Sequence, residues 1–181
     1  MAYIFGFWCA DGCIYGGKMF DITIHNKDKY ILKRIAEKLG YEGSLYDYVD
    51  RQACRLNFSC VVIYNDLVAL GGKENKSMDL EFPQVPKEYL PDFIRGYFDG
   101  DGCIMRLKGG RINSAFTCAS SAFLTKLHTI LKKEAGIVGG SYDKTSYSLK
   151  FGKKDSLKLG EYMYKNNPEL FLLRKKNKFI L

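Results

Sequence analysis

The pattern of apolar and polar residues runs through the same series of elements twice. Apolar side chains three to four residues apart predict one amphipathic helix in each half, with the faces Ile31, Ile35, Leu39 and Phe123, Leu127, Leu131. Gly40 and Gly136 follow these faces and predict the ends of the two helices. Ser120 or Ser121 is expected to cap the second helix at its N-terminus.

Each amphipathic helix lies between two predicted hairpins, and a short helix opens and closes each half. Strand-like stretches around glycine pairs predict first hairpins that turn at Gly16-Gly17 and Gly109-Gly110. The remaining expected elements are opening helices over 2–10 and 91–100, second hairpins over 44–60 and 140–151, and closing helices over 64–71 and 154–165. The sequence therefore predicts an α+β fold of two pseudosymmetric αββαββα repeats.

Identical residues recur at a fixed distance and support this duplication. Six residues repeat at an offset of 90, namely Ile4, Gly6, Asp11, Gly12, Cys13 and Ile14 as Ile94, Gly96, Asp101, Gly102, Cys103 and Ile104. Later matches, such as Gly40 with Gly136, have an offset of 96, which places about six extra residues of the second copy between Ile104 and its next helix. The expected organisation is a first repeat over 1–75, a polar linker over 76–89 and a second repeat over 90–181.

Small residues on the two opening helices predict that these helices pack against each other. Gly6 and Ala10 share one helix face, as do Gly96 and Gly100, and small residues at this spacing let two backbones approach closely. The helices would then meet at the axis that relates the repeats.

This packing would place Asp11 and Asp101 together at two helix C-termini. Partial negative charge at each terminus and repulsion between the carboxylates disfavour this arrangement, which a divalent cation such as Mg²⁺ would stabilise. An ordinary Asp-Gly turn is the alternative for one copy alone. Gly12 and Gly102 are expected to leave the helices in a left-handed conformation. Asp99, whose counterpart is Cys9, is expected to be a local or solvated residue.

Composition and charge indicate a polyanionic partner. The net charge is +8 over 181 residues, and it is uneven, with 11 basic and 12 acidic residues over 1–89 against 17 and 8 over 90–181. No apolar run approaches the roughly 20 residues of a membrane span, and no secretory signal is recognisable. The six cysteines form no CxxC pair, so small buried thiols in a reducing cytoplasm are expected rather than zinc or disulfide sites.

The segments "IFGFWCADG" (4–12) and "IRGYFDGDG" (94–102) resemble the motif of the LAGLIDADG homing endonucleases. The first copy departs from the motif at Cys9, where the first aspartate is replaced. "CASSAFLTKLHTIL" and "YSLKFGKKDSLKL" are also similar to the family's C-terminal half. Two motifs in one chain resemble the monomeric type, in which paired motif helices lie between two saddle-shaped sheets on DNA.

The resemblance implies a metal-dependent endonuclease that cuts a long, imperfectly palindromic site and leaves short 3′ overhangs. Asp11 and Asp101 would hold Mg²⁺ or Mn²⁺ with help from the carbonyls of Ala10 and Gly100. A lysine near the end of the fourth strand is typical of the family. Lys153 is the expected catalytic lysine, with Lys150 and Lys154 as the other candidates.

The resemblance also implies that outward residues of the hairpins contact double-stranded DNA in the major groove. The candidates in the first repeat are Lys18, Thr23, His25, Arg51, Arg55 and Asn57. In the second repeat, Arg106 and Lys108 are expected to share one strand face and Arg111 and Asn113 another, with further candidates Lys144, Ser148, Lys150 and Lys154. The longer hairpin of the second repeat predicts unequal recognition of the two half-sites. The basic segment 172–179 is expected to meet phosphates.

Two alternatives use the same fold, an intron RNA maturase and a DNA-binding protein without catalysis. Loss of either aspartate would favour the maturase, and both aspartates are present. A DNA-binding protein without catalysis would bind without metal and leave DNA intact. No splicing domain flanks the motifs, so a free-standing cytoplasmic enzyme is expected, or an organellar one if the gene lies in an organelle.

Overall fold

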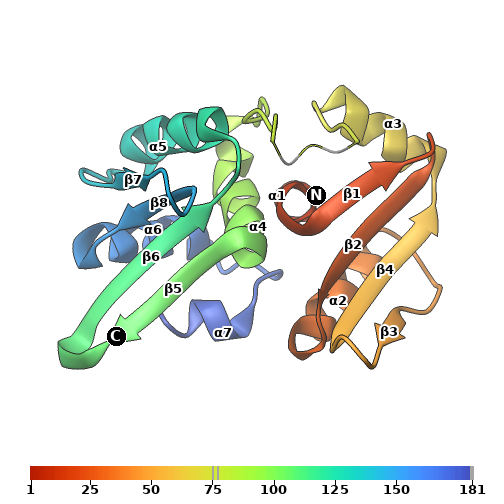
Figure 1. The fold of residues 1–181 in the computed structure, drawn as a ribbon, viewed down its shortest axis with the longest axis horizontal. Helices are drawn as coiled ribbons and strands as arrows, with labels where there is room; N and C mark the ends of the chain where they lie inside the picture. The colour runs from red at the N-terminus through yellow and green to blue at the C-terminus, as the bar shows by residue number, and fades with distance from the viewer. Residues whose placement is uncertain (75, 77, 180–181) are drawn as a thin grey trace.

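The computed structural model describes residues 1–74, 76 and 78–179. Two units of the same topology lie side by side, with one helix of each unit at the centre (Figure 1). In chain order the first unit contains α1 (Ala2–Asp11), β1 (Gly12–Tyr15), β2 (Met19–His25), α2 (Lys29–Lys38), β3 (Tyr46–Tyr48), β4 (Ala53–Ser59) and α3 (Val61–Ala69). The second contains α4 (Leu90–Asp101), β5 (Gly102–Leu107), β6 (Arg111–Thr117), α5 (Ser121–Ala135), β7 (Ser141–Asp143), β8 (Ser148–Phe151), α6 (Lys153–Tyr164) and α7 (Leu173–Lys176).

Each unit has one antiparallel sheet of four strands, ordered β1-β2-β4-β3 and β5-β6-β8-β7. The identical order confirms the predicted α+β duplication. Alternate residues of β2 and β6, such as Ile22 and Phe116, are buried beneath the sheets, where helices cover them. The other face of each sheet carries the more exposed residues, such as Thr23 and Arg111.

The predicted turns and caps are present where the chain reverses direction. Gly16 and Gly17 have φ of 59° and 71°, which favours glycine in a tight hairpin. The hydroxyl of Ser120 accepts a hydrogen bond from the Phe123 amide at 3.2 Å, and Gly136 ends α5 at φ 63°.

The extra residues of the second unit lie in two places rather than one. Gly12 pairs with Ile22 in the first hairpin, and its equivalent Gly102 pairs with Phe116, so the offset rises from 90 to 94 within the hairpin. The helix that follows has 15 residues in α5 against 10 in α2. The β5–β6 hairpin is therefore longer, as expected, but α5 also contains part of the insertion.

The segments that follow α3 and α6 each cross to the other unit. Phe82 of the linker packs against Phe93 and Phe123 of the second unit, with ring centroids 5.3 Å from each. After α6, the chain crosses to α2 of the first unit (Figure 1). Residue 75, the expected end of the first repeat, lies outside the described residues.

The six cysteines are free thiols and only half of them are fully buried. Cys9, Cys54 and Cys118 are buried, whereas Cys13 and Cys103 are exposed on β1 and β5. The expectation of uniformly buried thiols is wrong because outward strand positions follow each Asp-Gly pair. Over the described residues, every helix is too short or too polar to cross a membrane.

Candidate functional site

Helices α1 and α4 are in contact through their glycines. A Cβ atom added to Gly6 would collide with the carbonyl oxygen of Phe93, and one added to Gly96 would collide with that of Tyr3. These two contacts are related by the pseudo-twofold axis, since each pair differs by the offset of 90. The prediction that small residues bring the two backbones together is confirmed.

The same packing brings the two motif aspartates to one end of the helix pair. Asp11 is the last residue of α1 and Asp101 is the last residue of α4. A Cβ atom on Gly100 would lie 2.9 Å from Oδ2 of Asp11 and would also meet the side chain of Ala10. The carboxylate of Asp11 therefore extends across the helix interface into space that only a glycine leaves open.

Burial makes both carboxylates difficult to ionise. The pKa of Asp11 is raised to about 7, first by loss of solvent and then by the negative charge of Asp101. Burial also raises the pKa of Asp101. The sequence argument emphasised repulsion between the two charges, but burial is the larger cause.

Two buried lysines provide positive charge at this end of the helices. The Lys175 ammonium donates to the carbonyls of Phe98, Asp99 and Gly102 at 2.7, 2.6 and 2.6 Å and to that of Gly100 at 3.1 Å. Lys76 donates to the carbonyl of Gly12, and its ammonium lies 4.7 Å from the centre of the Trp8 ring. The two lysines thus neutralise the partial negative charge of the α4 and α1 C-termini.

The positive charges of both lysines favour ionised aspartates. Lys175 and then Lys76 lower the pKa of Asp11 against the larger effect of burial. Burial in turn lowers the pKa of Lys175 to about 8, and it lowers the pKa of Lys76 as well. Carboxylates and ammonium groups with shifted pKa values are typical of a reactive centre.

The glycines after the aspartates do not have the expected conformation. Gly12 has φ −99° and Gly102 has φ −84°, both in extended backbone, so the prediction of a left-handed exit is wrong. A Cβ atom at Gly12 would collide with the Trp8 side chain, and one at Gly102 would collide with Phe98. Lack of space, rather than backbone conformation, explains glycine at both positions.

Asp99 is neither local nor solvated, so this expectation is also wrong. Its side chain is 1% exposed, and Oδ2 accepts hydrogen bonds from the Tyr3 hydroxyl and the Leu172 amide, both at 2.8 Å. Burial raises the pKa of Asp99 to about 6. Asp99, at the end of α4, therefore connects α1 and the C-terminal segment through hydrogen bonds. Its position in the motif did not predict this structural role.

The donor atoms at the helix ends fit a hard divalent cation. Burial at the C-terminal ends of α1 and α4 disfavours the ionised form of both carboxylates, and a bound cation would stabilise that form. Among the described residues, no cluster of three or more His, Cys, Asp or Glu side chains is placed to hold a metal. The other ligands of a metal at Asp11 and Asp101 must therefore be backbone carbonyls, water or oxygens of the substrate. The Gly100 carbonyl already accepts from Lys175, and the expected roles of Ala10 and Gly100 as metal ligands stay predictions.

The structure places Lys153 away from the aspartates. Leu149 is level with Gly102, because both pair with Phe116 from opposite sides of β6. Lys153 comes four residues after Leu149, two strands from β5 and in the direction away from Asp101. Lys154 follows it in the exposed first turn of α6, and Lys150 forms an ion pair with Asp143 at 2.6 Å.

The outer face of the first sheet presents a connected polar network. Nε of Arg55 donates to Oδ2 of Asp21 at 2.7 Å, and its other nitrogens reach the hydroxyls of Tyr48 and Tyr15 at 3.2 and 3.1 Å. The Asn57 amide donates to the same Asp21 oxygen at 3.0 Å. Two expected DNA-contacting residues are thus fixed in place by a carboxylate that the sequence did not single out.

Most of the other expected DNA-contacting residues lie on outer faces or in exposed turns. Thr23 pairs with Arg55, and Asn113 and Arg111 share the outer face of β6. The side chains of Lys18, His25, Arg51, Lys108 and Lys144 are exposed.

Two expected positions differ from this arrangement. Arg106 pairs with the buried Ile112 and donates to the Lys178 carbonyl at 3.1 Å, so the expectation that it shares an outer face with Lys108 is wrong. Strand alternation places Met105 outward instead. Ser148 is 4% exposed and bonded to Ser146 at 2.6 Å.

The basic C-terminal segment does not behave as one phosphate-contacting surface. Lys175 is 4% exposed and lies under α4, while Arg174 pairs with Asp28. The sequence identified the charge of this segment, but the partners of these two residues are 70 or more positions away and could not be read from it.

Comparisons with known proteins agree with this architecture. Residues 88–163 match the family model described as a LAGLIDADG-like domain. The crystal structure of the LAGLIDADG homing endonuclease I-LtrWI bound to target DNA is similar, with a TM-score of 0.65 and 13% identity, covering 98% of this chain and 87% of that one. I-GzeII in complex with its DNA target has a TM-score of 0.65 and 12% identity, covering 98% and 86% of the two chains.

Two curated proteins of Methanocaldococcus jannaschii are similar over part of their length. DNA-directed RNA polymerase subunit Rpo1C is 32% identical over 108 residues, and a probable translation initiation factor IF-2 is 29% identical over 139 residues. The matches span 12% and 11% of these proteins and 55% and 71% of this chain. The second repeat thus matches the LAGLIDADG-like domain model, and both repeats together have the fold of single-chain LAGLIDADG homing endonucleases.

Proposed function

We propose that the chain is a site-specific endonuclease that cuts both strands of double-stranded DNA with Mg²⁺ or Mn²⁺ held at Asp11 and Asp101. The observation that carries this proposal is the placement of these two carboxylates, each beside a buried lysine, at one end of the helix pair. The DNA-bound structures of I-LtrWI and I-GzeII support the choice of ligand, because this chain has the same fold.

The two sheets would hold the duplex while the helix ends approach its backbone. Outward cations on the sheets would neutralise phosphates and read base edges in the major groove. The outer faces differ, with a fixed Asp21–Arg55 network on the first sheet and the longer β5–β6 hairpin on the second. Unequal contacts of this kind fit a long, imperfectly palindromic site recognised by one chain.

Each half of the centre would act on one strand and leave short 3′ overhangs. Bound divalent metal would activate water and neutralise charge on the leaving 3′ oxygen. Asp11 and Asp101 must be ionised to hold it, and Lys175 and Lys76 favour that state. With the scissile phosphate at the two aspartates, the two ammonium groups would stabilise the negative charge that develops during hydrolysis, and their bonds to the Gly12 and Gly102 carbonyls hold them in place beforehand.

A cleavage screen tests this function. The purified chain is incubated with a randomised duplex library in Mg²⁺, the cut ends are captured and sequenced, and D101N is treated in parallel. Double-strand cuts at one long site that disappear in D101N are expected. Retention of the same library and of structured intron RNA is measured in parallel. Selective DNA retention without cuts would indicate a DNA-binding protein, and retention of the RNA alone would indicate a maturase. Either result would overturn the nuclease proposal.

A further inference from the structure

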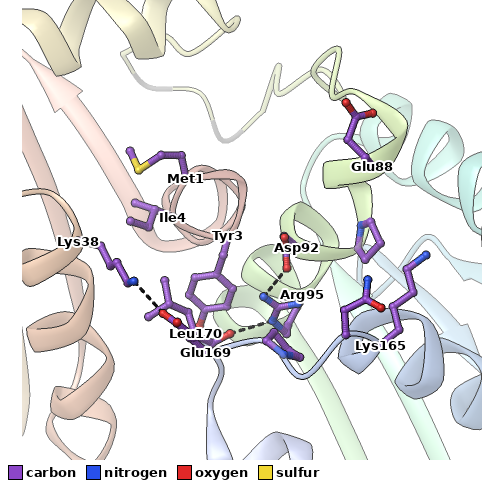
Figure 2. A pocket seen from close by; sticks show the side chains of 13 residues that line it. Met1, Tyr3, Ile4, Lys38, Glu88, Asp92, Arg95, Lys165, Glu169 and Leu170 are labelled. Atoms are coloured by element: carbon purple, nitrogen blue, oxygen red, sulfur yellow. Dashed lines mark hydrogen bonds and ion pairs between the residues drawn. The ribbon is translucent and has the colours of Figure 1, made fainter.

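The C-terminal strap, residues 168–175, reaches Lys175 only after crossing the first repeat. It runs along α2 in the reverse direction. Glu169 lies at the C-terminal end of α2, where its carboxylate pairs with Lys38 at 2.7 Å and its carbonyl accepts from Arg34 at 2.7 Å. Figure 2 shows this beginning of the strap, with Glu169 extended toward Lys38 and Leu170 beside Arg95.

The middle of the strap is fixed through its backbone. The amide of Leu173 donates to the Tyr30 hydroxyl at 2.6 Å, and this hydroxyl donates to the Phe171 carbonyl at 3.2 Å. The Leu172 amide donates to Asp99 at 2.8 Å. Two residues before Lys175, the path of the chain is therefore defined by both repeats.

The last anchor is a bidentate pair between Arg174 and Asp28. Nε of Arg174 lies 2.8 and 3.0 Å from the two carboxylate oxygens, and Nη2 lies 2.6 Å from Oδ2. Asp28 is 4% exposed and belongs to the first repeat, immediately before α2. Bidentate pairs of this kind fix orientation as well as distance.

Arg174 and Lys175 are neighbours in α7, yet their side chains serve different repeats. Arg174 is bound to the first repeat, and Lys175 is buried under the C-terminus of α4 in the second. Fixing the Arg174 side chain therefore fixes the backbone from which Lys175 extends. Lys76 has no equivalent dependence, because its segment crosses at Phe82, after the lysine has been placed.

We propose that Asp28 and Arg174 form a positioning pair that crosses between the repeats and holds Lys175 in place beside the Asp101 half of the catalytic centre. This inference rests on the proposed nuclease function for its effect on cleavage. In this role both residues act through Lys175, whose ammonium they position. Loss of the pair should slow cleavage of one strand more than that of the other, because Lys175 is bonded to backbone carbonyls of the second repeat alone.

Strand-resolved cleavage separates positioning from general structural support. The first variant is R174Q, because the Arg174 side chain is 42% exposed and glutamine retains an amide that can donate to the buried Asp28 carboxylate. With each strand of the cognate duplex labelled separately, kcat for one strand should fall about 10- to 100-fold while KM changes less than about twofold. Nicked product should accumulate. An equal loss on both strands would overturn the proposal.

Two further variants show whether the effect passes through Lys175. D28N should reproduce R174Q, and the double variant should be no slower than either, because removal of one partner already breaks the pair. In a K175M background, R174Q should add nothing to the loss. Additive effects would contradict a single positioning pair. E169Q, which removes an ion pair from the same strap, is the matched control and should cut both strands at the wild-type rate.

A labelling measurement decides the position of Lys175 without reference to activity. The chain is treated briefly with an amine-acylating reagent, and each lysine is quantified by peptide mass spectrometry. In R174Q the acylation of Lys175 should rise at least about fivefold, as its buried hydrogen bonds are loosened, while that of Lys76 stays constant. Unchanged Lys175 reactivity would overturn the positioning pair. If the wild-type chain cuts no DNA, the nuclease proposal fails alone, and the labelling result still decides this one.

Discussion

Gly96 of α4 lies directly against the backbone carbonyl of Tyr3 in α1, with no space for even one methyl group. The symmetric contact of Gly6 with Phe93 repeats the relationship on the other side of the axis. Direct van der Waals contact between the two backbones therefore sets the distance between the helices. It also sets the distance between the two aspartates at their ends.

Replacement of Gly96 by alanine should separate the helices and destabilise the chain. We expect G96A to lower the free energy of unfolding by about 3 kcal/mol, near the upper end for overpacked sites, as measured by urea denaturation. G152A is the control, because a Cβ atom at Gly152 meets nothing within 4 Å and its φ is −79°. It should cost no more than about 1 kcal/mol. A G96A variant as stable as wild type would contradict the close packing.

The stability of the metal-free chain should depend on pH through Asp11. Its pKa is about 7 in the folded state against 3.8 in the unfolded state, so folding favours the protonated form. The stabilisation is complete below pH 3.8 and is lost as the pH rises through 7. In EDTA at pH 8, D11N should therefore be more stable than wild type by about 1–3 kcal/mol, and the difference should vanish near pH 4.

Addition of Mg²⁺ should reverse this order at pH 8. Bound metal stabilises only the folded chain with ionised carboxylates, so the melting temperature of wild type should rise while that of D11N stays nearly constant. Melting curves with EDTA and with Mg²⁺ at each pH provide the measurement. A metal-induced shift of equal size in D11N would show that the cation binds elsewhere.

The two candidate lysines of the second repeat should differ sharply in their effect on cleavage. K175M should lower the cleavage rate by about 100-fold, because it removes a positive charge that would stabilise the negative charge developing on the phosphodiester in the transition state. K153M should cut within about threefold of wild type, because Lys153 is exposed at the start of α6 and lies two strands away. Single-turnover cleavage of the cognate duplex measures both. A large loss in K153M would instead confirm the prediction that Lys153 is the catalytic lysine.

Asp21 should control how selectively Arg55 recognises its base. D21N removes the carboxylate that holds the guanidinium, so affinity for unrelated DNA should rise while discrimination at one base pair falls about tenfold. Competition binding with single-base variants of the site, without metal, provides the readout. D143N is the control on the second sheet, because its pair with Lys150 is more exposed and should contribute little. Unchanged discrimination in D21N would exclude a fixed reading role for Arg55.

The sequence predicted the features that depend on periodicity and repetition. Helix faces such as Ile31 and Ile35 follow from spacing, and the duplicated Asp11 and Asp101 follow from a constant offset. Features that depend on distant partners could not be predicted. Asp99 looked like a surface residue because its donors, Tyr3 and Leu172, are 96 and 73 positions away.

The buried lysines illustrate the same limit. The negative charge at the two helix ends predicts a compensating cation, and the sequence pattern indicates a metal but not the two lysines. Lys76 and Lys175 follow α3 and α6, in segments with no apolar repeat to indicate their path. The available signal was a lysine after the closing helix of each half, since helix C-termini favour cations.

The crossing of the strap has a consequence for how such proteins can be recombined. Duplicated repeats invite the exchange of whole halves to build hybrids with new target sites. Here a transplanted second repeat would carry Lys175 with it but would leave behind Tyr30 and Asp28, the residues on which that lysine's path depends. A hybrid that keeps Lys175 in place must therefore contain the second repeat together with Asp28 and Tyr30 of the first repeat. The two repeats cannot be exchanged independently.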